Sequence, residues 1–250
     1  MESHVVQYQY LKKGIIKMGM DKHIVAIGGG GFGRNPNNPI IEKYILDLCP
    51  SKKPTITFFP TASAENSDYI VNFYTAFAKL NCTAQHISLF KNTPDLNKII
   101  DESDIIYVGG GNTKSMLAVF REWKLDKLII DAYKKGKILA GVSAGAICWF
   151  DKGITDSWDN GLRILECMNI LEGTCCPHYD GESDRRPSVE NFLRLKNITS
   201  CFCIEDGAAL HYKNDCIETA ISFYDNKNVY RVTYDDNKLV EVPLSKIDIE

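Results

Sequence analysis

The sequence of 250 residues predicts an α/β protein built on a mostly parallel β-sheet, and three observations support this prediction. Short apolar runs typical of buried strands alternate with amphipathic segments through the first 142 residues, and such alternation places helices on both faces of a parallel sheet. Glycine-rich tracts follow several of the apolar runs, where α/β proteins form their binding loops. The stretch Gly141-Val-Ser143-Ala-Gly145 has the pattern of a nucleophile elbow, a tight turn from strand to helix.

The length and composition fit a single soluble domain, residues 21–250, after a leader segment, residues 1–20. The net charge is −3 and the basic residues are scattered, which argues against nucleic acid and membrane surfaces as partners. No apolar run approaches the ~18 residues that span a bilayer, and the N-terminus lacks the features of a signal peptide. We therefore expect a cytoplasmic protein.

The nine cysteines are best explained as free thiols in a reducing compartment. Their number is odd, there is no Cys-x-x-Cys pair, and most of them lie inside apolar runs. Cys175-Cys176 and Cys201-x-Cys203 lack the spacing of zinc ligands. The sequence therefore predicts neither a disulfide framework nor a metal, and we expect no cofactor.

The first 142 residues predict five strands and the helices that connect them. The strands are expected at 23–28, 54–60, 82–89, 104–108 and 138–142, and the helices at 39–48, 68–80, 95–101, 113–123 and 125–135.

The tract Gly28–Arg34 follows the first strand and could be mistaken for a nucleotide loop. However, Asn35-Pro36 comes next, which cannot begin a helix at once, and no Gly-Lys-Ser/Thr is present. A flexible loop that borders an active site at the carboxyl end of a central strand is the better interpretation.

After the Ser143 turn the pattern loosens. We expect a buried helix to begin at residue 144, a polar loop at 151–163, a strand within 169–178 and a helix at 188–196. Short strands are expected at 200–204, 208–212, 216–223 and 229–233, with Asp206-Gly207 as a hairpin signal.

Ser143 is the candidate nucleophile. The uncharged run 138–142 reads as a buried strand, and the turn after it crowds the backbone on both sides of the serine. Glycine at positions 141 and 145 relieves that crowding. The alternative is a glycine-rich turn whose serine merely caps the following helix.

The second informative loop is Gly109-Gly110-Gly111-Asn112-Thr113, at the end of the fourth strand. Backbone N–H groups can approach a ligand closely at glycines. In a hydrolase with a nucleophile elbow, the oxyanion donors are the N–H after the nucleophile, here Ala144, and an N–H from such a loop, here Gly110 or Gly111. In the alternative interpretation, Asn112 simply caps the next helix.

A serine nucleophile needs a general base, and an acid that orients this base. Of the five histidines, only His178 lies in a polar loop after a strand; the others are His4, His23, His86 and His211. Periodicity does not decide which carboxylate is the acid. The candidates are Asp151, Asp156, Asp159, Asp180, Glu182 and Asp184.

Three motifs in order resemble the peptidase E (aspartyl dipeptidase) family of serine peptidases, to which cyanophycinases also belong: 109–113, 141–146 and Pro177-His178. The resemblance covers about residues 22 to 225 and implies a three-layer α/β sandwich, similar to class I glutamine amidotransferases and flavodoxin. In that larger group the elbow residue is usually cysteine, so Ser143 favours the serine peptidase branch.

The resemblance also implies roles for particular residues. Ser143 would attack a peptide carbonyl, His178 would take its proton, and Gly110 and Ala144 would stabilise the oxyanion. Counting back from the stretch before His178 places the family's acid near Asp156, with Asp159 as the alternative. The local sequence departs from the peptidase E pattern there, and we expect an uncharacterised branch of the family.

The substrate would meet polar groups near Ser143, namely Asn112, Glu182, Arg185 and Arg186. An arginine here could hold a carboxylate with two hydrogen bonds, or simply be solvated. We expect a serine exopeptidase of small peptides, such as a dipeptidase, and the resemblance also admits a homodimer. The alternatives are an isopeptidase of β-aspartyl linkages, a transferase, and a non-catalytic binding protein on the same fold.

Overall fold

The computed structural model describes residues 21–249, so the expected leader segment 1–20 lies outside the described residues. The strands are β1 (His23–Ile27), β2 (Thr55–Phe59), β3 (Thr83–His86), β4 (Ile105–Val108), β5 (Ile138–Val142), β6 (Phe150–Thr155), β7 (Arg163–Glu166), β8 (Leu171–Cys176), β9 (Cys201–Ile204), β10 (Ala208–Lys213), β11 (Cys216–Ser222), β12 (Val229–Asp235), β13 (Lys238–Pro243) and β14 (Lys246–Asp248). The α-helices are α1 (Ile40–Asp47), α2 (Ser67–Phe77), α3 (Leu96–Glu102), α4 (Thr113–Glu122), α5 (Leu125–Lys134), α6 (Ala144–Ile147) and α7 (Arg185–Arg194). Two short 3-10 helices, η2 (Gly31–Gly33) and η3 (Thr61–Ser63), follow β1 and β2.

The central sheet has the strand order β14-β11-β10-β1-β5-β4-β2-β3. Its core is parallel, because β1, β5, β4, β2 and β3 all run in the same direction. Strand β10 joins β1 in the antiparallel direction, and β11 continues that side of the sheet. All five strands expected in the first half of the sequence are present, and the mostly parallel α/β sheet is confirmed.

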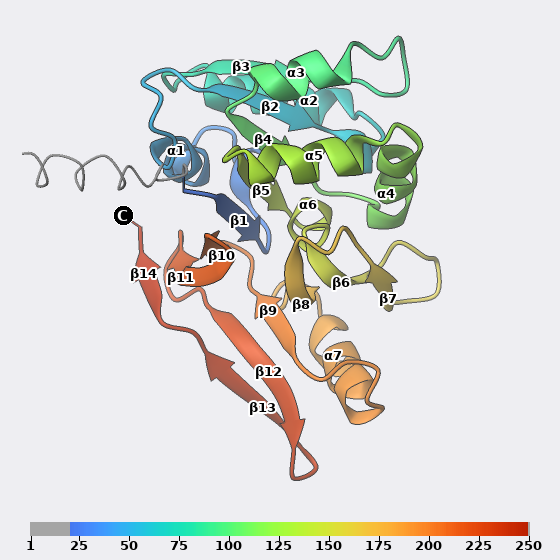
Figure 1. Ribbon diagram of the computed structural model, residues 1–250. Coiled ribbons are helices and arrows are strands. Elements are labelled where there is room, and N and C mark those ends of the chain that lie inside the picture. The colour runs from blue at the N-terminus through green and yellow to red at the C-terminus, as the bar shows by residue number, and fades with distance from the viewer. Residues whose placement is uncertain (1–20, 250) are drawn as a thin grey trace, which may run out of the picture.

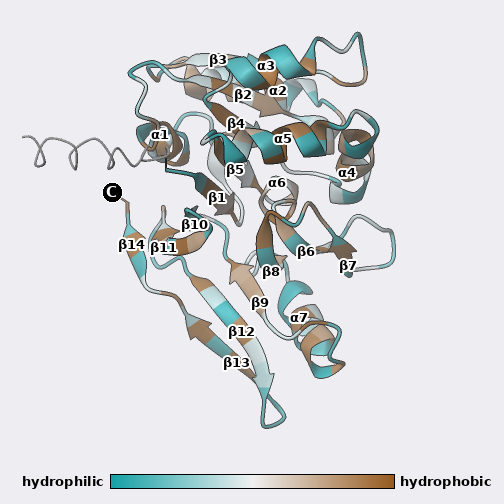
Figure 2. Cartoon of the chain, in the orientation of Figure 1, coloured by the Kyte–Doolittle hydropathy of each residue, from teal (hydrophilic) through white to brown (hydrophobic). Residues whose placement is uncertain are grey.

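Helices cover both faces of the central sheet (Figure 1), as the alternation of side chains along β1 illustrates. Ile24 and Ala26 pack in one buried cluster with residues of α3, α4 and α5. Val25 and Ile27 point the other way, into a second cluster with residues of α1 and α2. The strands are apolar whereas α3 and α5 show hydrophilic outer faces (Figure 2), so the three-layer arrangement buries both faces of the parallel strands.

A second sheet, which the sequence analysis did not separate from the first, has the order β13-β12-β9-β8-β6-β7. Strands β6, β8 and β9 are parallel neighbours, so the chain segments that follow β8 and β9 emerge at one edge. Helix α7 packs against this sheet through Val189 and Leu193, beside Val232 of β12. The loops after β8 and β9 supply two residues of the candidate site.

Three expectations for the second half were wrong in detail. The apolar run after Ser143 forms only a single helical turn, α6, and the loop expected at 151–163 begins with strand β6. Helix α7 begins at Arg185 instead of residue 188, and β13 and β14 had no counterpart in the sequence analysis. Cys148, Trp149 and Phe150 are fully buried, and a continuous buried run has no apolar period that separates a helix from a strand.

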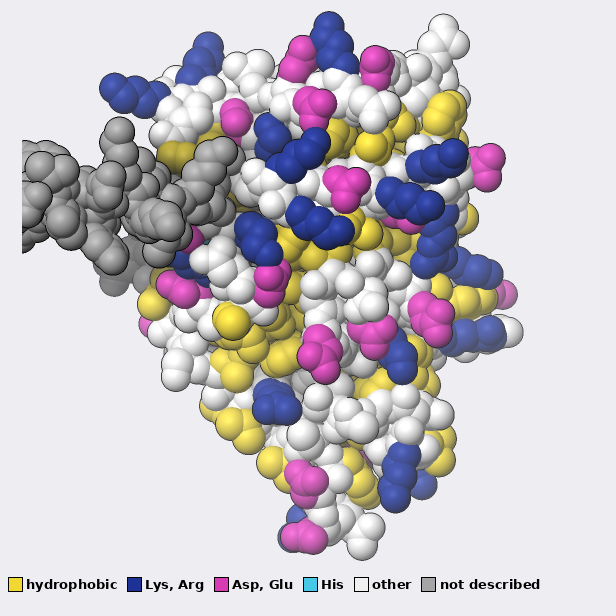
Figure 3. All heavy atoms as spheres, in the orientation of Figure 1, with side chains coloured by type: hydrophobic (Ala, Val, Ile, Leu, Met, Phe, Trp, Pro, Cys, Tyr) yellow, Lys and Arg dark blue, Asp and Glu magenta, His cyan; other side chains and the backbone are white. Residues whose placement is uncertain are grey.

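Charged side chains of both signs are interspersed on the face of the molecule drawn in Figure 3, with no large basic patch. Within residues 21–249 no helix has the length and apolar character needed to cross a membrane. The nine cysteines are all free thiols, and Cys216 is the exposed one among them.

Candidate active site

Ser143 lies on a strained turn between β5 and α6. Its φ of 56° and ψ of −112° are unusual for a residue with a side chain, and such conformations cost about 1–3 kcal/mol. A Cβ at Gly141 would lie 2.2 Å from the Gly145 carbonyl oxygen, and a Cβ at Gly145 would lie 2.0 Å from that of Val108. The turn therefore requires glycine on both sides of the serine, which is the geometry of a nucleophile elbow.

His178 follows β8 and reaches across to Ser143. Its Nε2 lies 2.9 Å from the Ser143 Oγ, and only 7% of its surface is exposed. Its φ of 54° is again in the left-handed region, so the backbone is held in an uncommon conformation at both residues. The structure thus brings together the serine and the histidine that the sequence singled out.

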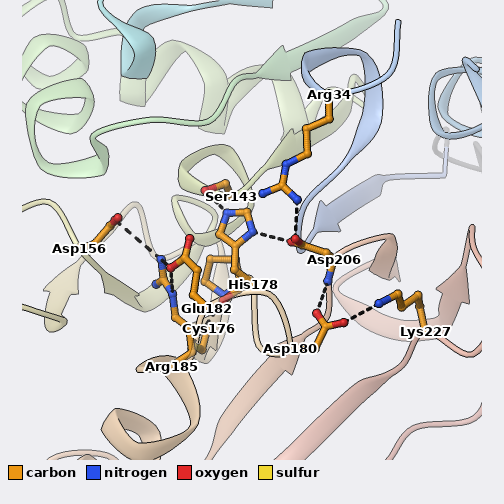
Figure 4. A network of polar contacts seen from close by, with 11 residues as sticks. Arg34, Ser143, Asp156, Cys176, His178, Asp180, Glu182, Arg185, Asp206 and Lys227 are labelled. Atoms are coloured by element: carbon orange, nitrogen blue, oxygen red, sulfur yellow. Dashed lines mark hydrogen bonds and ion pairs between the residues drawn. The ribbon is translucent and has the colours of Figure 1, made fainter. Parts of the chain in front are cut away.

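Asp206 is the carboxylate that holds the histidine. Its Oδ1 lies 2.6 Å from the His178 Nδ1, so Ser143, His178 and Asp206 form one continuous chain of hydrogen bonds (Figure 4). Asp206 is the second residue after β9, in the turn that leads to β10, and pairs there with Gly29 of the loop after β1. The carboxyl ends of β1, β5, β8 and β9 therefore converge on this site.

The expectation that Asp156 or Asp159 orients the histidine is corrected by this contact. The Asp156 side chain is 65% exposed and lies 3.8 Å from Arg185, on the other side of the histidine from Asp206 (Figure 4). Asp159 is exposed and forms no ion pair among the described residues. Asp206 had been read only as part of an Asp-Gly hairpin signal, yet its place in the turn at the carboxyl end of a buried strand was the feature that could have identified it.

Charged neighbours fix the Asp206 carboxylate in place. Arg34 donates from Nη1 to the Asp206 Oδ2 over 2.5 Å. The backbone N–H of Asp206 donates to Oδ1 of Asp180 over 2.8 Å. Asp180 is paired in turn with Lys227. Burial alone would raise the pKa of Asp206, but the hydrogen bonds from His178 and Arg34 outweigh it and lower this pKa to about 2. Asp206 is therefore ionised at neutral pH and accepts from both partners.

Two glycines make room for this carboxylate. A Cβ at Gly29 would lie 1.9 Å from the Asp206 Oδ1 and 2.8 Å from the His178 Nδ1. A Cβ at Gly181 would lie 2.6 Å from the Asp206 Oδ2. Contacts below 3.0 Å are not tolerated without movement, so the tract after β1 needs glycine at position 29 for the approach of Asp206 rather than for a nucleotide.

The loop after β4 lies against the elbow. A Cβ at Gly110 would lie 3.7 Å from the Ser143 Oγ. The Gly110 N–H donates to the hydroxyl of Tyr69 over 3.3 Å, whereas the N–H groups of Gly111 and Ala144 have no hydrogen-bond partner within residues 21–249. Of the three expected oxyanion donors, Gly111 and Ala144 are thus available to a ligand, and Gly110 is paired with Tyr69.

Two cavities meet at Ser143 and His178. The first, of about 330 Å³, lies between the loop after β1 and helix α2 and includes Arg34, Asp68 and Tyr69. The second, of about 230 Å³, lies between the loop after β4 and the start of α7 and includes Asp156, Glu182 and Arg185. A substrate bound across Ser143 would place one part in each cavity.

The four residues expected to bind substrate differ in position. Asn112 lines the second cavity, but its side chain accepts from Ser115 N–H and donates to the Ser157 carbonyl. Glu182 and Arg185 line the same cavity. Arg186 lies in neither of the two cavities and is paired with Glu241 of β13.

Arg185 is 2% exposed and its guanidinium is engaged by the protein itself. It donates to Glu182 and to the Ile154 carbonyl, and its Nη2 lies 2.6 Å from the Glu182 carboxylate. Few of its donors remain for a substrate carboxylate. The lining contains two carboxylates, Glu182 and Asp156, and one arginine, so the second cavity carries a formal charge of −1.

Three side chains of the site form a group suited to nucleophilic chemistry. Within the described residues, no three His, Cys, Asp or Glu side chains are grouped so that they could hold a metal ion. Ser143, a histidine within hydrogen-bond reach, and a carboxylate on the histidine's other nitrogen form the constellation that activates a hydroxyl for acyl transfer. The two unpaired N–H groups beside the serine could receive the developing oxyanion.

Comparisons with known proteins show what the chain is similar to. The profile of peptidase family S51 matches residues 24–220. The chain is 44% identical over 224 residues to the uncharacterized peptidase YgaJ of Bacillus subtilis, covering 89% of this chain and 97% of that protein. It is 30% identical over 188 residues to Peptidase E of Shewanella oneidensis, covering 67% and 77% of the two chains. The fold is similar to the crystal structure of a peptidase from an acI-B1 Actinobacterium, with a TM-score of 0.65, 17% identity, and coverage of 91% and 96%.

Proposed function

Because the chain belongs to peptidase family S51, we propose that it is a serine exopeptidase that hydrolyses small peptides through an acyl-enzyme on Ser143. The observation that carries the proposal is the unbroken chain of hydrogen bonds from Ser143 through His178 to Asp206. A serine whose hydroxyl faces a histidine held by an ionised carboxylate is prepared for attack on a carbonyl.

In the first half of the reaction, the Ser143 Oγ attacks the peptide carbonyl carbon while His178 Nε2 takes the hydroxyl proton. Asp206 keeps the proton on Nδ1 of the histidine, so that Nε2 is the free base, and stabilises the imidazolium that forms. His178 then gives its proton to the leaving amine as the peptide C–N bond breaks. In the second half, water activated by His178 attacks the ester and releases Ser143.

The N–H groups of Gly111 and Ala144 support the step in which negative charge develops on the carbonyl oxygen. Ala144 begins α6 directly after Ser143, and Gly111 lines the second cavity together with Ser143; neither N–H has another partner among the described residues. One donor of this kind typically contributes about 10²–10³ in kcat. In this proposal Gly110 supports the loop rather than contacting the oxyanion itself.

The sizes of the two cavities support small substrates. With about 330 Å³ and 230 Å³ on the two sides of Ser143, each cavity has room for one or two residues rather than for a long chain. The acidic second cavity suits a cationic group, such as the free amino terminus of a peptide. These features favour an exopeptidase acting on dipeptides or similarly short peptides.

A β-aspartyl isopeptidase is the second candidate. Asp156 and Glu182 in the second cavity could also hold the guanidinium of an arginine attached through a β-aspartyl linkage. This function would use the same acyl-enzyme chemistry on Ser143. The two candidates differ only in the bond that is presented to the serine.

We place the reaction in the cytoplasm. Nine free thiols in one chain suit a reducing compartment, in which disulfides seldom persist.

The experiment that tests the proposal is cleavage of a dipeptide panel by the wild type and by Ser143→Ala. The panel contains α-Asp-X, β-Asp-X, β-Asp-Arg and neutral X-X peptides. Cleavage is measured as the release of free amino acids. We expect one class to be cleaved by the wild type and the rate to fall by about 10⁴-fold or more in the variant. Cleavage that Ser143→Ala retains in full would contradict the proposal.

A further inference from the structure

Arg34 is held at the edge of the candidate site by a well-anchored loop. The Phe32 side chain of this loop is fully buried. Its ring packs against those of Phe58, Tyr69 and Tyr107, with centroid distances of 5.1–5.2 Å. The Phe32 N–H donates to the carboxyl of Glu42 over 2.6 Å. The loop was expected to be flexible, but Phe32 anchors it two residues before Arg34. This anchor fixes the position of the Arg34 backbone.

The Arg34 guanidinium is only partly used by the protein. Its Nη1 donates to the Asp206 Oδ2, while Nε and Nη2 have no partner among residues 21–249. The side chain is 59% exposed and lines the same cavity as Ser143 and His178. Figure 4 shows it extending from the loop after β1 toward Asp206, beside the histidine ring. A ligand in this cavity therefore meets two free hydrogen-bond donors on a permanent cation.

The two arginines at the site differ in this respect. Arg185 in the second cavity is buried, each of its three guanidinium nitrogens has Glu182 or the Ile154 carbonyl as a partner, and the cavity around it is acidic. Arg34 in the first cavity is paired through one nitrogen only. Guanidinium groups bind carboxylates through two parallel N–H donors, and Arg34 has the donors to do so. The cavity also contains Asp68, which is exposed and forms no ion pair with Arg34.

We propose that Arg34 binds the C-terminal carboxylate of the substrate in the first cavity, while its Nη1 continues to hold Asp206. The inference rests on the proposed function, because it assigns one end of a short peptide to each cavity. The amino terminus would meet Asp156 and Glu182, and the carboxyl terminus would meet Arg34. A peptide that makes both contacts across Ser143 must be short, which gives a physical reason for selection by length.

Binding of the substrate carboxylate is separate from the other role of Arg34, which is to hold Asp206 in place against His178. As a partner of Asp206 it is a positioning residue, whose loss should affect every substrate alike. As a carboxylate-binding residue it should affect only substrates that carry the free carboxylate. Comparing a peptide with its C-terminal amide isolates the second role.

The test uses binding, so that it does not depend on turnover. In the Ser143→Ala background, calorimetric titration compares each dipeptide of the panel with its C-terminal amide, with and without Arg34→Ala. We expect the free acid to bind at least about tenfold more tightly than the amide when Arg34 is present, since a charge-assisted hydrogen bond is lost in the amide. This preference should disappear in Ser143→Ala/Arg34→Ala.

The control is Ser143→Ala/Arg194→Ala, which removes an exposed arginine of α7 that lies in neither cavity, and it should keep the preference. Arg34→Lys keeps the charge beside Asp206 but not the planar pair of donors, and should retain only part of the preference. Circular dichroism of each variant verifies folding.

Three outcomes would overturn the inference: an equal preference with and without Arg34, no preference in either protein, or no binding of any free acid. An effect of Arg34→Ala confined to peptides with acidic side chains would also overturn it, because the recognised carboxylate would then be a different one. If the free acid binds through Arg34 while the wild type cleaves nothing, the inference stands and the proposed peptidase reaction fails.

Discussion

His178 and Asp206 are separated by 28 residues in the chain, and their Nδ1 and Oδ1 atoms lie 2.6 Å apart. His178 lies in the loop after β8, and Asp206 lies in the loop after β9. Strands β8 and β9 are parallel neighbours in the second sheet. Adjacent parallel strands present their carboxyl ends at one edge, so the pair is a direct consequence of the strand order. The second sheet thus builds the histidine and its acid, and the first sheet supplies Ser143.

Replacing Asp206 by Asn should separate the role of this carboxylate from that of Asp156. Asn can keep a contact with Nδ1 but favours the wrong tautomer of His178, and a comparable substitution in a serine protease lowers kcat by about 10⁴-fold. We expect a loss of this order in Asp206→Asn on the best peptide of the panel, with Asp156→Asn as the matched comparison. A larger loss of kcat in Asp156→Asn than in Asp206→Asn would show that the geometry has been assigned to the wrong acid.

The hydroxyl of Tyr69 should support turnover through the loop after β4. It accepts the Gly110 N–H, next to Gly111, and its ring lies close to Gly33 and Gly109, where added Cβ atoms would lie 2.8–2.9 Å from it. Tyr69→Phe leaves the Gly110 N–H without an acceptor, so we expect kcat to fall by about tenfold to a hundredfold with a smaller change in KM.

Tyr74→Phe is the control for this substitution. Tyr74 lies on the same helix, α2, but its hydroxyl is bonded to the His86 Nδ1. Its steady-state kinetics should match the wild type. Equal kinetics of Tyr69→Phe and Tyr74→Phe would mean that the Gly110 contact has no role in the reaction.

Glu42 should make the stability of the protein depend on pH. It is fully buried, its Oε2 has no partner among the described residues, and burial raises its pKa from 4.5 to about 7. The contribution of protonated Glu42 to the free energy of unfolding is fully present below pH 4.5 and is lost as the pH rises to about 7. The reason is that the unfolded chain releases this proton at a lower pH than the folded protein does. The difference corresponds to on the order of 3 kcal/mol of unfolding free energy.

Urea denaturation at pH 5 and pH 8 measures this effect. Glu42→Gln keeps an acceptor for the Phe32 N–H and cannot ionise, so it should lose much less stability than the wild type between the two pH values. Glu122→Gln, on the exposed face of α4, should behave like the wild type. The prediction fails if Glu42→Gln and the wild type lose the same free energy over this range.

Cys148 should be irrelevant to the nucleophilic step although it lies five residues after Ser143. It is fully buried, and burial raises the pKa of its thiol well above the usual value. Iodoacetamide should therefore modify the exposed Cys216 first and leave the peptidase activity intact. Rapid inactivation that accompanies alkylation of Cys148 would contradict this account.

The sequence was informative where the structure depends on local geometry. Glycine is required at 141 by a contact within the elbow and at 145 by a contact with the neighbouring strand β4, so the pattern around Ser143 was sufficient to predict the elbow. His178 could be found by elimination among five histidines. The five parallel strands were also predictable, because each is a short apolar run between amphipathic helices.

Asp206 depends on a contact that no local pattern encodes. Its neighbour Gly207 made it look like a residue of a hairpin turn, and the pairing of β8 with β9 is needed to bring it to His178. Strand β6 was missed for a related reason. Its first residue, Phe150, is the last of the apolar run 146–150, which has no period that separates a helix from a strand. Arg34 likewise reaches the site only because Phe32 is buried in the aromatic cluster.

The measurement that tests the central claim most directly is peptide mapping after treatment with a fluorophosphonate, which bonds covalently to activated serine hydroxyls. The account predicts one adduct, on Ser143, that forms rapidly in the wild type and far more slowly in His178→Ala. Absence of an adduct on Ser143 in folded wild-type protein, or equally rapid labelling of Ser143 without His178, would contradict the claim that His178 activates Ser143 as the nucleophile.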